Sequence, residues 1–367
     1  MKELIELTDL CAKRIADMEE KKKKIGDFLK EVNSSTNLTL GTEIFEEKVI
    51  IPIKKIELDG LKVGGIDGGL VKRSLHGIDI MLLRAVGVIF GYKDGKLTDT
   101  EYFPDAFPSP VPKVVFDPFS DVELEMNSNM ERQMMEIGTA KEVVEKFKPD
   151  ILFLNGSIVP HYSDRPAKNS VLNLSFEKMI ESYIGLYSAI KHSDTILAGV
   201  VEDSRGTRFC EVVNQKILEG IQNIESVKVL LETTRDSSLL SYVLGQGERS
   251  FVFKYSANPE NHPVLKEFGG QTANQVFSFY AKTAEFDRPV RVDFLADKGI
   301  NSIANKISSV LLALAGHCSY GIPSVIIEAD QRAKLSEKDL DMFYIDLINK
   351  VGNLPGLFNL RREQRPF

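Results

Sequence analysis

Residues 61–103 read LKVGGIDGGLVKRSLHGIDIMLLRAVGVIFGYKDGKLTDTEYF, and this stretch decides the fold. It contains three β-rich apolar runs, at residues 61–66, 78–90 and 97–103. Asp94-Gly95 separates the last two runs, and an Asp-Gly pair between such runs is a strong hairpin signal. The stretch therefore predicts three consecutive strands that pair antiparallel.

Helical and apolar segments alternate after these strands. Apolar side chains recur at helical spacing over residues 125–147, and Pro149 ends this expected helix. Residues 151–154 are an apolar run typical of a buried parallel strand, and a helix at 172–192 and a strand at 195–201 follow. This order predicts the α/β fold class, with a ribonuclease H-like mixed sheet flanked by helices.

The rest of the chain adds an N-terminal helix and helical insertions to this core. Residues 1–32 have the spacing of an amphipathic helix, residues 33–60 form a connector with some strand, and residues 103–113 form a proline-rich loop. Towards the C-terminus we expect helices at 210–222, 300–316 and 336–349, and strands at 275–282, 290–294 and 324–327.

The composition argues against several classes of protein. The 367 residues carry 46 Lys and Arg against 53 Asp and Glu, a formal net charge of -7, which argues against a general polyanion-binding surface but leaves room for a local basic groove. The three cysteines form no Cys-x-x-Cys pair, so we expect a reducing compartment. No apolar run reaches the length of a membrane span, and the N-terminus lacks the apolar core of a signal peptide.

Asp67 is the first candidate for a catalytic or metal-binding residue. It lies in GGIDGG, residues 64–69, at the expected end of a buried strand. The flanking glycines leave space for a metal ion and a phosphate group to approach the backbone. An Asp-Gly turn between two strands explains the motif equally well. The sequence contains no phosphate-binding loop, zinc-ligand spacing or nucleophilic-serine motif.

Two glutamates of the expected helix at 125–147 are further candidates. Glu136 shares a helical face with three apolar residues, so it can point toward the sheet. Glu131 lies on the neighbouring stripe of the helix. A single glutamate on a helix is usually solvated, and only the predicted position of this helix beside Asp67 favours a functional role.

Two polar side chains follow other apolar runs. Asn155 closes the strand at 151–154, where a ribonuclease H-like core normally holds a carboxylate. Its amide can offer an oxygen to Mg²⁺ or Mn²⁺ but adds no negative charge. Asp330, in the segment EADQR, follows the expected strand at 324–327 and is a fourth possible ligand position.

The segment VEDSRGTR, residues 201–208, follows the strand at 195–201. It brings together two acids and two guanidinium groups, those of Glu202, Asp203, Arg205 and Arg208. Arginine binds phosphate oxygens bidentately, so the segment suits phosphate recognition. An ion-paired surface turn is an equal alternative.

At these positions the sequence resembles the NurA nuclease family. GIDGG, ILFLNGSI and AGVVEDSR match in order, and the most specific segments are FSFYAKTAEFDRPVRVDFL at 277–295 and YGIPSVIIEADQRAKL at 320–335. The resemblance covers about residues 61–345. It implies an N-terminal helix and connector over residues 1–60 and a NurA-like ribonuclease H-fold nuclease domain over residues 61–350.

The resemblance also implies an activity and partners. Members of the family cut DNA, at single strands or duplex ends and in exo- and endonuclease modes, with Mn²⁺ or Mg²⁺ held by clustered acids. They form homodimers and work with HerA, a hexameric ATPase, in DNA end resection and double-strand break repair. This implies a cytoplasmic DNA-binding hydrolase.

The resemblance assigns roles residue by residue. Asp67 matches the first metal-binding Asp of the family, and Glu136 matches its helix Glu, with Glu131 as the rival. Asn155 occupies the position of the family's next Asp in this chain, and Asp330 occupies the position of its His. The implied catalytic residues are Asp67, Glu136 and Asp330, and Asn155 joins them as a metal ligand.

Other departures from the family pattern leave the activity open. Ile322 replaces a Tyr, and Glu202 stands where a basic residue often follows the third core strand. Asp203 or Glu202 can supply the charge missing at Asn155. Two arginines of the same segment, Arg205 and Arg208, are the candidates for substrate binding. The alternatives are a catalytically impaired homologue that serves as an interaction subunit and, from another class, a small-molecule phosphohydrolase.

Overall fold

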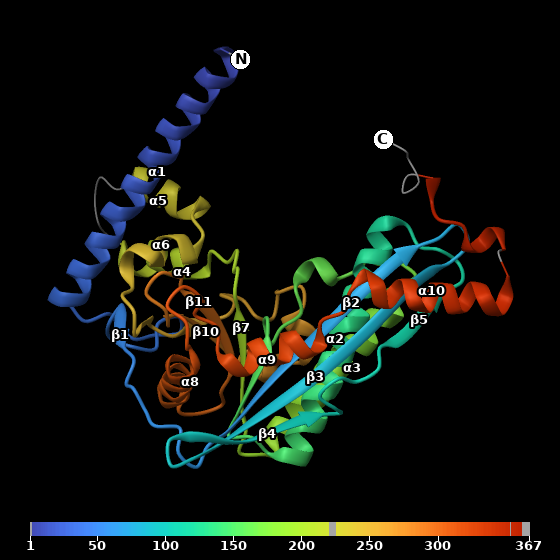
Figure 1. The fold of residues 1–367 in the computed structure, drawn as a ribbon. Helices are drawn as coiled ribbons and strands as arrows, with labels where there is room; N and C mark the ends of the chain where they lie inside the picture. Colours follow the sequence, from blue (N-terminus) through green and yellow to red (C-terminus); the bar gives the residue numbers. More distant parts are fainter. Residues whose placement is uncertain (1, 220–224, 353, 362–367) are drawn as a thin grey trace. The chain divides into compact units, whose positions relative to one another are not determined.

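The computed structural model describes residues 2–219, 225–352 and 354–361 (Figure 1). The chain forms two compact units. Unit 1 comprises Met1–Glu57, Gly199–Pro259 and Gln271–Pro323, and unit 2 comprises Leu58–Ala198, Glu260–Gly270 and Ser324–Phe367. The division of the chain into residues 1–60 and 61–350 stays a prediction.

Unit 2 contains the mixed sheet that the sequence predicts. Its strands are β2 (Lys62–Ser74), β3 (Asp79–Lys93), β4 (Lys96–Phe103), β5 (Val111–Val115) and β6 (Ile151–Asn155). β2 pairs antiparallel with β3 and parallel with β6, and β3 pairs antiparallel with β4 and β5. The three consecutive antiparallel strands and the parallel strand β6 are therefore confirmed.

The turn between β3 and β4 follows from its two residues. Asp94 and Gly95 both have positive φ angles, of 53° and 69°. A two-residue hairpin loop with two such residues matches the twist of the flanking strands, and Asp-Gly adopts it readily. This confirms the predicted hairpin.

Two segments of this sheet differ from the prediction. β2 does not end at Asp67 but continues to Ser74, so the carboxylate lies inside the strand, opposite Val86 of β3. The predicted proline-rich loop contains β5, in which Pro112 lies opposite Leu82. A strand at a sheet edge tolerates proline because one row of its amides needs no partner.

Helices cover both faces of β2. They are α2 (Asp121–Phe147), α9 (Ser324–Ala333) and α10 (Glu337–Val351), and α3 (Asn173–Lys191) packs on α2. A Cβ atom built on Gly68 would meet Glu136 of α2, whereas one built on Gly65 would lie 2.6 Å from the carbonyl oxygen of Val325 in α9. Odd- and even-numbered residues of a strand point to opposite faces. α2 and α9 therefore lie on opposite sides of β2, and glycines let both helices approach the backbone.

The predicted strand at 324–327 is wrong, because these residues form the first turn of α9. The buried residues of α9 are Val325, Ile326, Ala329 and Ala333. Their spacing fits a helix, but a four-residue apolar run alone fits a strand equally well. Asp330 consequently belongs to a helix and not to the end of a strand.

Unit 1 contains a second group of strands and helices. Its strands are β1 (Ile50–Pro52), β8 (Glu248–Ser250), β9 (Phe253–Lys254), β10 (Val276–Lys282) and β11 (Val290–Leu295), and all their mutual pairings are antiparallel. Its helices are α1 (Lys2–Ser35), α4 (Arg208–Val212), α5 (Glu225–Thr233), α6 (Asp236–Val243) and α8 (Ile300–Leu314). β7 (Ile196–Val201) and α7 (Gly270–Ala273) contain residues of both units. The predicted helix at 210–222 is α4 with a π-helical turn, and its residues 220–222 lie outside the described residues.

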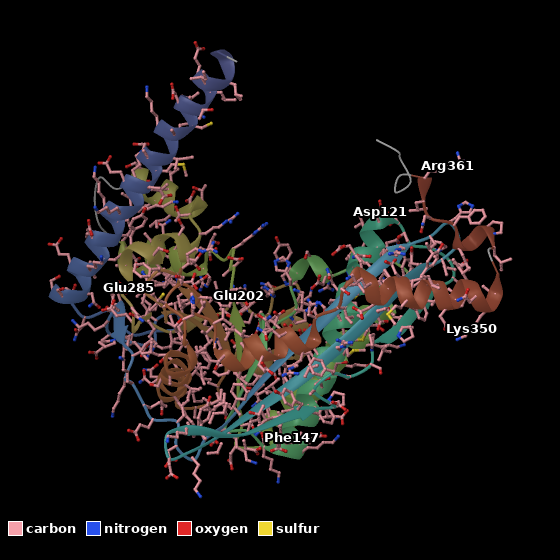
Figure 2. The ribbon with its side chains drawn as sticks, viewed as in Figure 1. Asp121, Phe147, Glu202, Glu285, Lys350 and Arg361 are labelled. Carbon is pink, nitrogen blue, oxygen red and sulfur yellow. The ribbon has the colours of Figure 1, made fainter. Side chains whose placement is uncertain are left out.

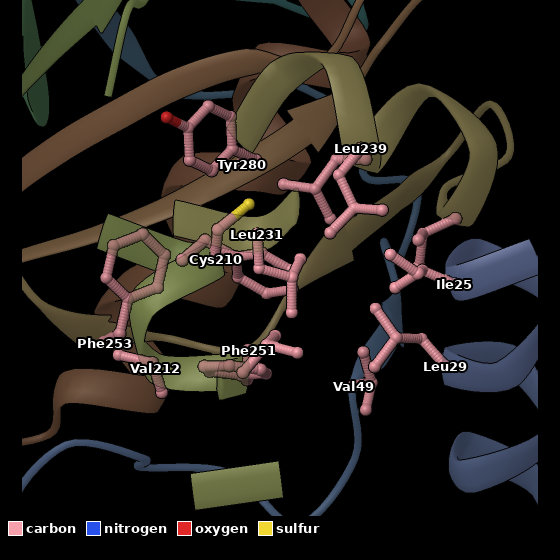
Figure 3. Packing of buried hydrophobic residues seen from close by; sticks show 14 of the residues in the cluster. Ile25, Leu29, Val49, Cys210, Val212, Leu231, Leu239, Phe251, Phe253 and Tyr280 are labelled. Carbon is pink, nitrogen blue, oxygen red and sulfur yellow. The ribbon is translucent and has the colours of Figure 1, made fainter. Parts of the chain in front are cut away.

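The two halves of α1 have different surroundings. Ile25 and Leu29 belong to the buried core of unit 1, where Leu29 lies beside Val49 (Figure 3). The apolar residues of the first half are exposed: Leu4, Ile5, Leu7, Leu10, Ile15 and Met18. The predicted amphipathic helix is confirmed, and its first half leaves an apolar stripe uncovered in this chain. Among the described helices, none is long and apolar enough to cross a membrane.

Candidate active site

Asp67 lies at the centre of the candidate site, in unit 2. Its side chain is only 6% exposed. One carboxylate oxygen accepts a hydrogen bond from the Gly68 amide at 2.7 Å, and the other accepts one from the Asn155 side-chain amide at 3.1 Å. The parallel register, which pairs Ile66 with Leu154, places Asn155 beside Asp67. β6 ends at Asn155, so the Asp67 carboxylate lies where β2 is no longer paired with β6 but still pairs with β3.

Glu136 approaches the same point from α2. A Cβ atom on Gly68 would lie 2.6 Å from Cγ of Glu136, so only glycine leaves space for this side chain. Glu136 is 12% exposed and pairs with Arg132, one helical turn earlier. Glu131 instead pairs with Lys113 of β5. Of the two glutamates, Glu136 is therefore the one that lies next to β2 at the site.

Asp330 is exposed and lies on α9, which covers the other face of β2. Gly65, Asp67 and Gly69 point to this face, because they alternate with the residues that face α2. The negative charge of Asp330 contributes to raising the pKa of Asp67. The structure thus brings Asp67, Asn155 and Asp330 together on one face of β2, with Glu136 approaching at Gly68.

Burial raises the pKa of both central carboxyl groups. The pKa of Asp67 rises to about 6, mainly through loss of hydration, and hydrogen bonds from Asn155 and Gly68 oppose the shift. The pKa of Glu136 rises to about 7, also mainly through burial, with the charge of Asp67 adding to it and that of Arg132 opposing it. Because Asp67 raises the pKa of Glu136, the two groups need positive charge nearby to be ionised together.

The donor atoms at this place fit a hard divalent cation. Asp67, Glu136 and Asp330 offer carboxylate oxygens and Asn155 an amide oxygen, which are the ligands that Mg²⁺ and Mn²⁺ prefer. Within residues 2–219, 225–352 and 354–361, however, no three His, Cys, Asp or Glu side chains are arranged to hold a metal ion. Arg132 supplies the positive charge at Glu136 instead. Ion binding would therefore require these side chains to rearrange.

A polar and aromatic cluster fixes α9 beside the site. Glu328 accepts hydrogen bonds from the Tyr102 hydroxyl and from Nε of Arg332, each at 2.8 Å. The Arg332 guanidinium lies 5.0 Å from the ring centre of Tyr102 and 4.4 Å from that of Phe107. This cluster links β4 to the helix that carries Asp330.

Sequence reasoning missed this cluster and Arg132. The signal for Arg132 was present, because Arg132 and Glu136 stand four residues apart on a helix. Tyr102 and Arg332 are far apart in the sequence, and only the fold brings them together.

The four candidates of residues 201–208 belong to unit 1. Glu202, labelled in Figure 2, accepts a hydrogen bond from the Tyr320 hydroxyl at 3.0 Å. Asp203 pairs with Arg288 at 2.7 Å, and the buried Arg208 pairs with Glu43 and Glu211. Arg205 is exposed. Ile322 is buried in the same unit. The idea that Asp203 or Glu202 compensates for Asn155 stays a prediction.

The mixed sheet, its central carboxylate and the covering helices define an α/β protein of the ribonuclease H-like class. The NurA domain, as a sequence family, matches residues 61–335. The chain therefore belongs to the NurA family.

Solved structures of NurA proteins have the same fold. The NurA nuclease from Sulfolobus solfataricus aligns with a TM-score of 0.58 and 16% identity, over 95% of each chain. A NurA crystallised with manganese aligns at 0.54 and 9% identity, over 94% of this chain and 99% of that one. A NurA bound to dAMP and manganese aligns at 0.53 and 9% identity, over 95% and 96%. Comparison with curated protein sequences gave no match.

Proposed function

We propose that this chain is a metal-dependent deoxyribonuclease of the NurA type, which hydrolyses phosphodiester bonds of DNA with Mn²⁺ or Mg²⁺. The observation that carries the proposal is the position of Glu136, which lies against Gly68, the residue after the buried Asp67, and feels the negative charge of Asp67 inside a NurA domain. The manganese and the dAMP in structures of other NurA proteins support it.

The residues of the site suggest a division of labour. Asp67 and Glu136 would hold the cation through carboxylate oxygens, and Asn155 and Asp330 would add further oxygens. A cation bound there would polarise the phosphoryl group and lower the pKa of a coordinated water. Glu136 must first give up its ion pair with Arg132, which leaves this guanidinium free to face a phosphate oxygen.

The two glutamates of α2 provide a matched test. We expect Glu136→Gln and Asp67→Asn to lower the rate of single-stranded DNA cleavage at least about 100-fold, and to weaken Mn²⁺ binding in calorimetry. Glu131→Gln removes the same charge from the same helix, but Glu131 pairs with Lys113. It should change both quantities less than about twofold. Equal effects of Glu131→Gln and Glu136→Gln would contradict this assignment of the site.

A second candidate function is a catalytically impaired NurA homologue that serves as an interaction subunit. Two observations favour it. Residue 155 is an asparagine where a carboxylate is expected, and Arg132 already pairs with Glu136. The same Mn²⁺ titration separates the two candidates. An impaired homologue would bind DNA or a protein partner, but it would neither bind Mn²⁺ at Asp67 nor cut DNA.

The biological setting belongs to the same proposal. We propose that the chain acts on single strands or duplex ends, in DNA end resection and double-strand break repair in the cytoplasm, with a HerA-like hexameric ATPase. Membership of the NurA family supports this setting. The three cysteines are free, which fits a reducing compartment. Co-purification with the HerA-like ATPase encoded in the same genome, followed by a resection assay of the pair, tests it.

A further inference from the structure

We propose that unit 1 carries a binding site for the phosphate backbone of a DNA strand, with Arg205 and Arg235 as its two anchors. The proposal rests on the proposed function for the choice of DNA as the ligand, but not on catalysis. Its basis is a cavity of unit 1 with a volume of about 660 Å³. α1, the segment after β7 and the start of α6 line this cavity.

The two arginines come from segments that are bonded side by side. Arg205 follows β7, and Arg235 is the N-cap residue of α6. The amide of Asp236, the residue after Arg235, donates to the carbonyl of Gly206, the residue after Arg205, at 2.9 Å. This hydrogen bond fixes the two arginine backbones next to each other at the cavity wall.

A buried carboxylate holds this junction in place. Asp236 is 1% exposed and accepts hydrogen bonds from the amides of Phe209 and Cys210, at 3.0 and 2.9 Å. It also accepts one from the Tyr280 hydroxyl at 3.0 Å. The backbones of the two arginines are therefore held at one junction, and both guanidinium groups start from neighbouring segments of the cavity wall.

The charges that line the cavity leave these two guanidinium groups available. Asp203 pairs with Arg288, and Glu19 pairs with Lys22 and accepts from the Tyr242 hydroxyl. The remaining acid, Glu202, accepts from the Tyr320 hydroxyl. Arg205 and Arg235 are both exposed and have no carboxylate partner within the part of the chain that the structure describes.

This pattern fits the phosphate groups of a polynucleotide. A guanidinium binds phosphate oxygens through two parallel hydrogen bonds. Successive phosphates of a strand can each bind one of the two arginines, whereas a single small anion cannot span separate guanidinium groups. The overall charge of -7 does not oppose this, because four cations against three acids line the cavity.

The test is binding of a fluorescein-labelled 20-nucleotide oligo-dT by fluorescence anisotropy, in EDTA so that no cleavage occurs. We expect the double variant Arg205→Gln/Arg235→Gln to bind at least about tenfold more weakly at about 100 mM salt. The slope of log K against log salt should fall by about 1.4, since each lost phosphate contact of a single strand contributes about 0.7.

A second double variant, Arg14→Gln/Lys298→Gln, is the matched control. It removes two exposed cations of unit 1 that do not line the cavity. It should bind the strand within about twofold of the parent, and thermal unfolding should show that both variants are folded. If the Arg205/Arg235 variant binds like this control, the proposal is overturned.

Competition with small anions distinguishes a strand from other phosphate ligands. Millimolar dAMP and inorganic phosphate should displace the oligonucleotide poorly. If either binds the parent as tightly as the strand does, and loses affinity in the Arg205/Arg235 variant, the site takes a small anion and the strand assignment is overturned. A parent that binds DNA through these arginines without cutting it would support the site while contradicting the nuclease proposal.

Discussion

Asn155 stands where a carboxylate is expected, and its amide donates to Asp67. We expect Asn155→Asp to tighten Mn²⁺ binding about tenfold, because it adds a charged oxygen ligand beside Asp67. Asn155→Ala removes both the donor and the oxygen, so it should weaken binding. Calorimetric titration of the parent and both variants measures the effect. If Asp203 compensates for the amide, Asp203→Ala should instead abolish binding while Asn155→Asp changes it little.

The pKa values of the site predict how the stability of the metal-free protein depends on pH. The pKa values of Asp67 and Glu136 are raised to about 6 and about 7, so the folded state keeps protons that the unfolded state releases. The free energy of unfolding should therefore fall as pH rises from about 4 to about 7, by up to about 1.4 kcal/mol per pH unit for each proton. Urea unfolding at several pH values checks this.

Variants and metal provide the controls for this pH dependence. The double variant Asp67→Asn/Glu136→Gln should flatten this part of the profile, because neither side chain titrates. Mn²⁺ affinity should rise with pH over the same range, since the ion binds ionised carboxylates. An identical profile for parent and double variant would mean that other groups cause the dependence.

Part of the site can be predicted from residue types and spacing. Asp67 among glycines and Glu136 on the inner face of a helix are local patterns, and the structure places Glu136 against Gly68, the residue after Asp67. The sequence predicts Asp330 at the end of a strand, but Asp330 lies on the helix α9, so the predicted element is wrong. Glu131 differs from Glu136 because it forms an ion pair with Lys113. Lys113 lies on β5, a strand that the sequence does not predict.

At the scale of elements, two neighbouring glycines of β2 allow contrasting predictions. A Cβ atom on Gly69 would collide with the backbone carbonyl of Ala333 in α9, whereas one on Gly68 would meet the Glu136 side chain, which can rotate away. We expect Gly69→Ala to lower the free energy of unfolding by about 1–3 kcal/mol. Gly68→Ala should lower it by less than about 1 kcal/mol but weaken Mn²⁺ binding about tenfold. Urea unfolding and calorimetry measure the two effects.

Gly138 in α2 provides the control for these glycine variants. A Cβ atom there meets nothing within 4 Å, and the position is helical. Gly138→Ala should therefore raise the free energy of unfolding by about 0.5–1 kcal/mol, because alanine favours a helix over glycine. If Gly69→Ala is as well tolerated as Gly138→Ala, α9 does not pack on β2 as described.

Most elements could be predicted because their signals are local. The hairpin at Asp94-Gly95 and the helix that ends before Pro149 follow from short sequence patterns. The prediction of a strand at 324–327 is wrong, because the helix there depends on the glycines of β2 against which it packs. β5 likewise depends on pairing with β3, and its prolines are typical of a loop.

At the scale of the whole molecule, we expect a homodimer, which α1 helps to form. Leu4, Leu7 and Ile15 of α1 are 66%, 56% and 61% exposed, which is a large apolar stripe to leave in water. Light scattering should give about twice the 41.1 kDa of one chain at micromolar concentrations. Replacing these three residues by Gln should shift the mass toward one chain. Phe286→Gln, at an exposed residue of unit 1, is the control and should leave the mass unchanged.

The glycines of β2 also couple local opening to the site. Glycine loses more backbone freedom on ordering than any other residue, and four of the six residues from Gly64 to Gly69 are glycines. The order of this segment therefore depends on its strand neighbours and on α9, whose backbone packs directly on it. The amide hydrogens of this segment and of α9 should then exchange with solvent as one cooperative unit. Each such opening would separate Asp330 from Asp67. The rate at which the short helix α9 opens would therefore limit the lifetime of a bound ion.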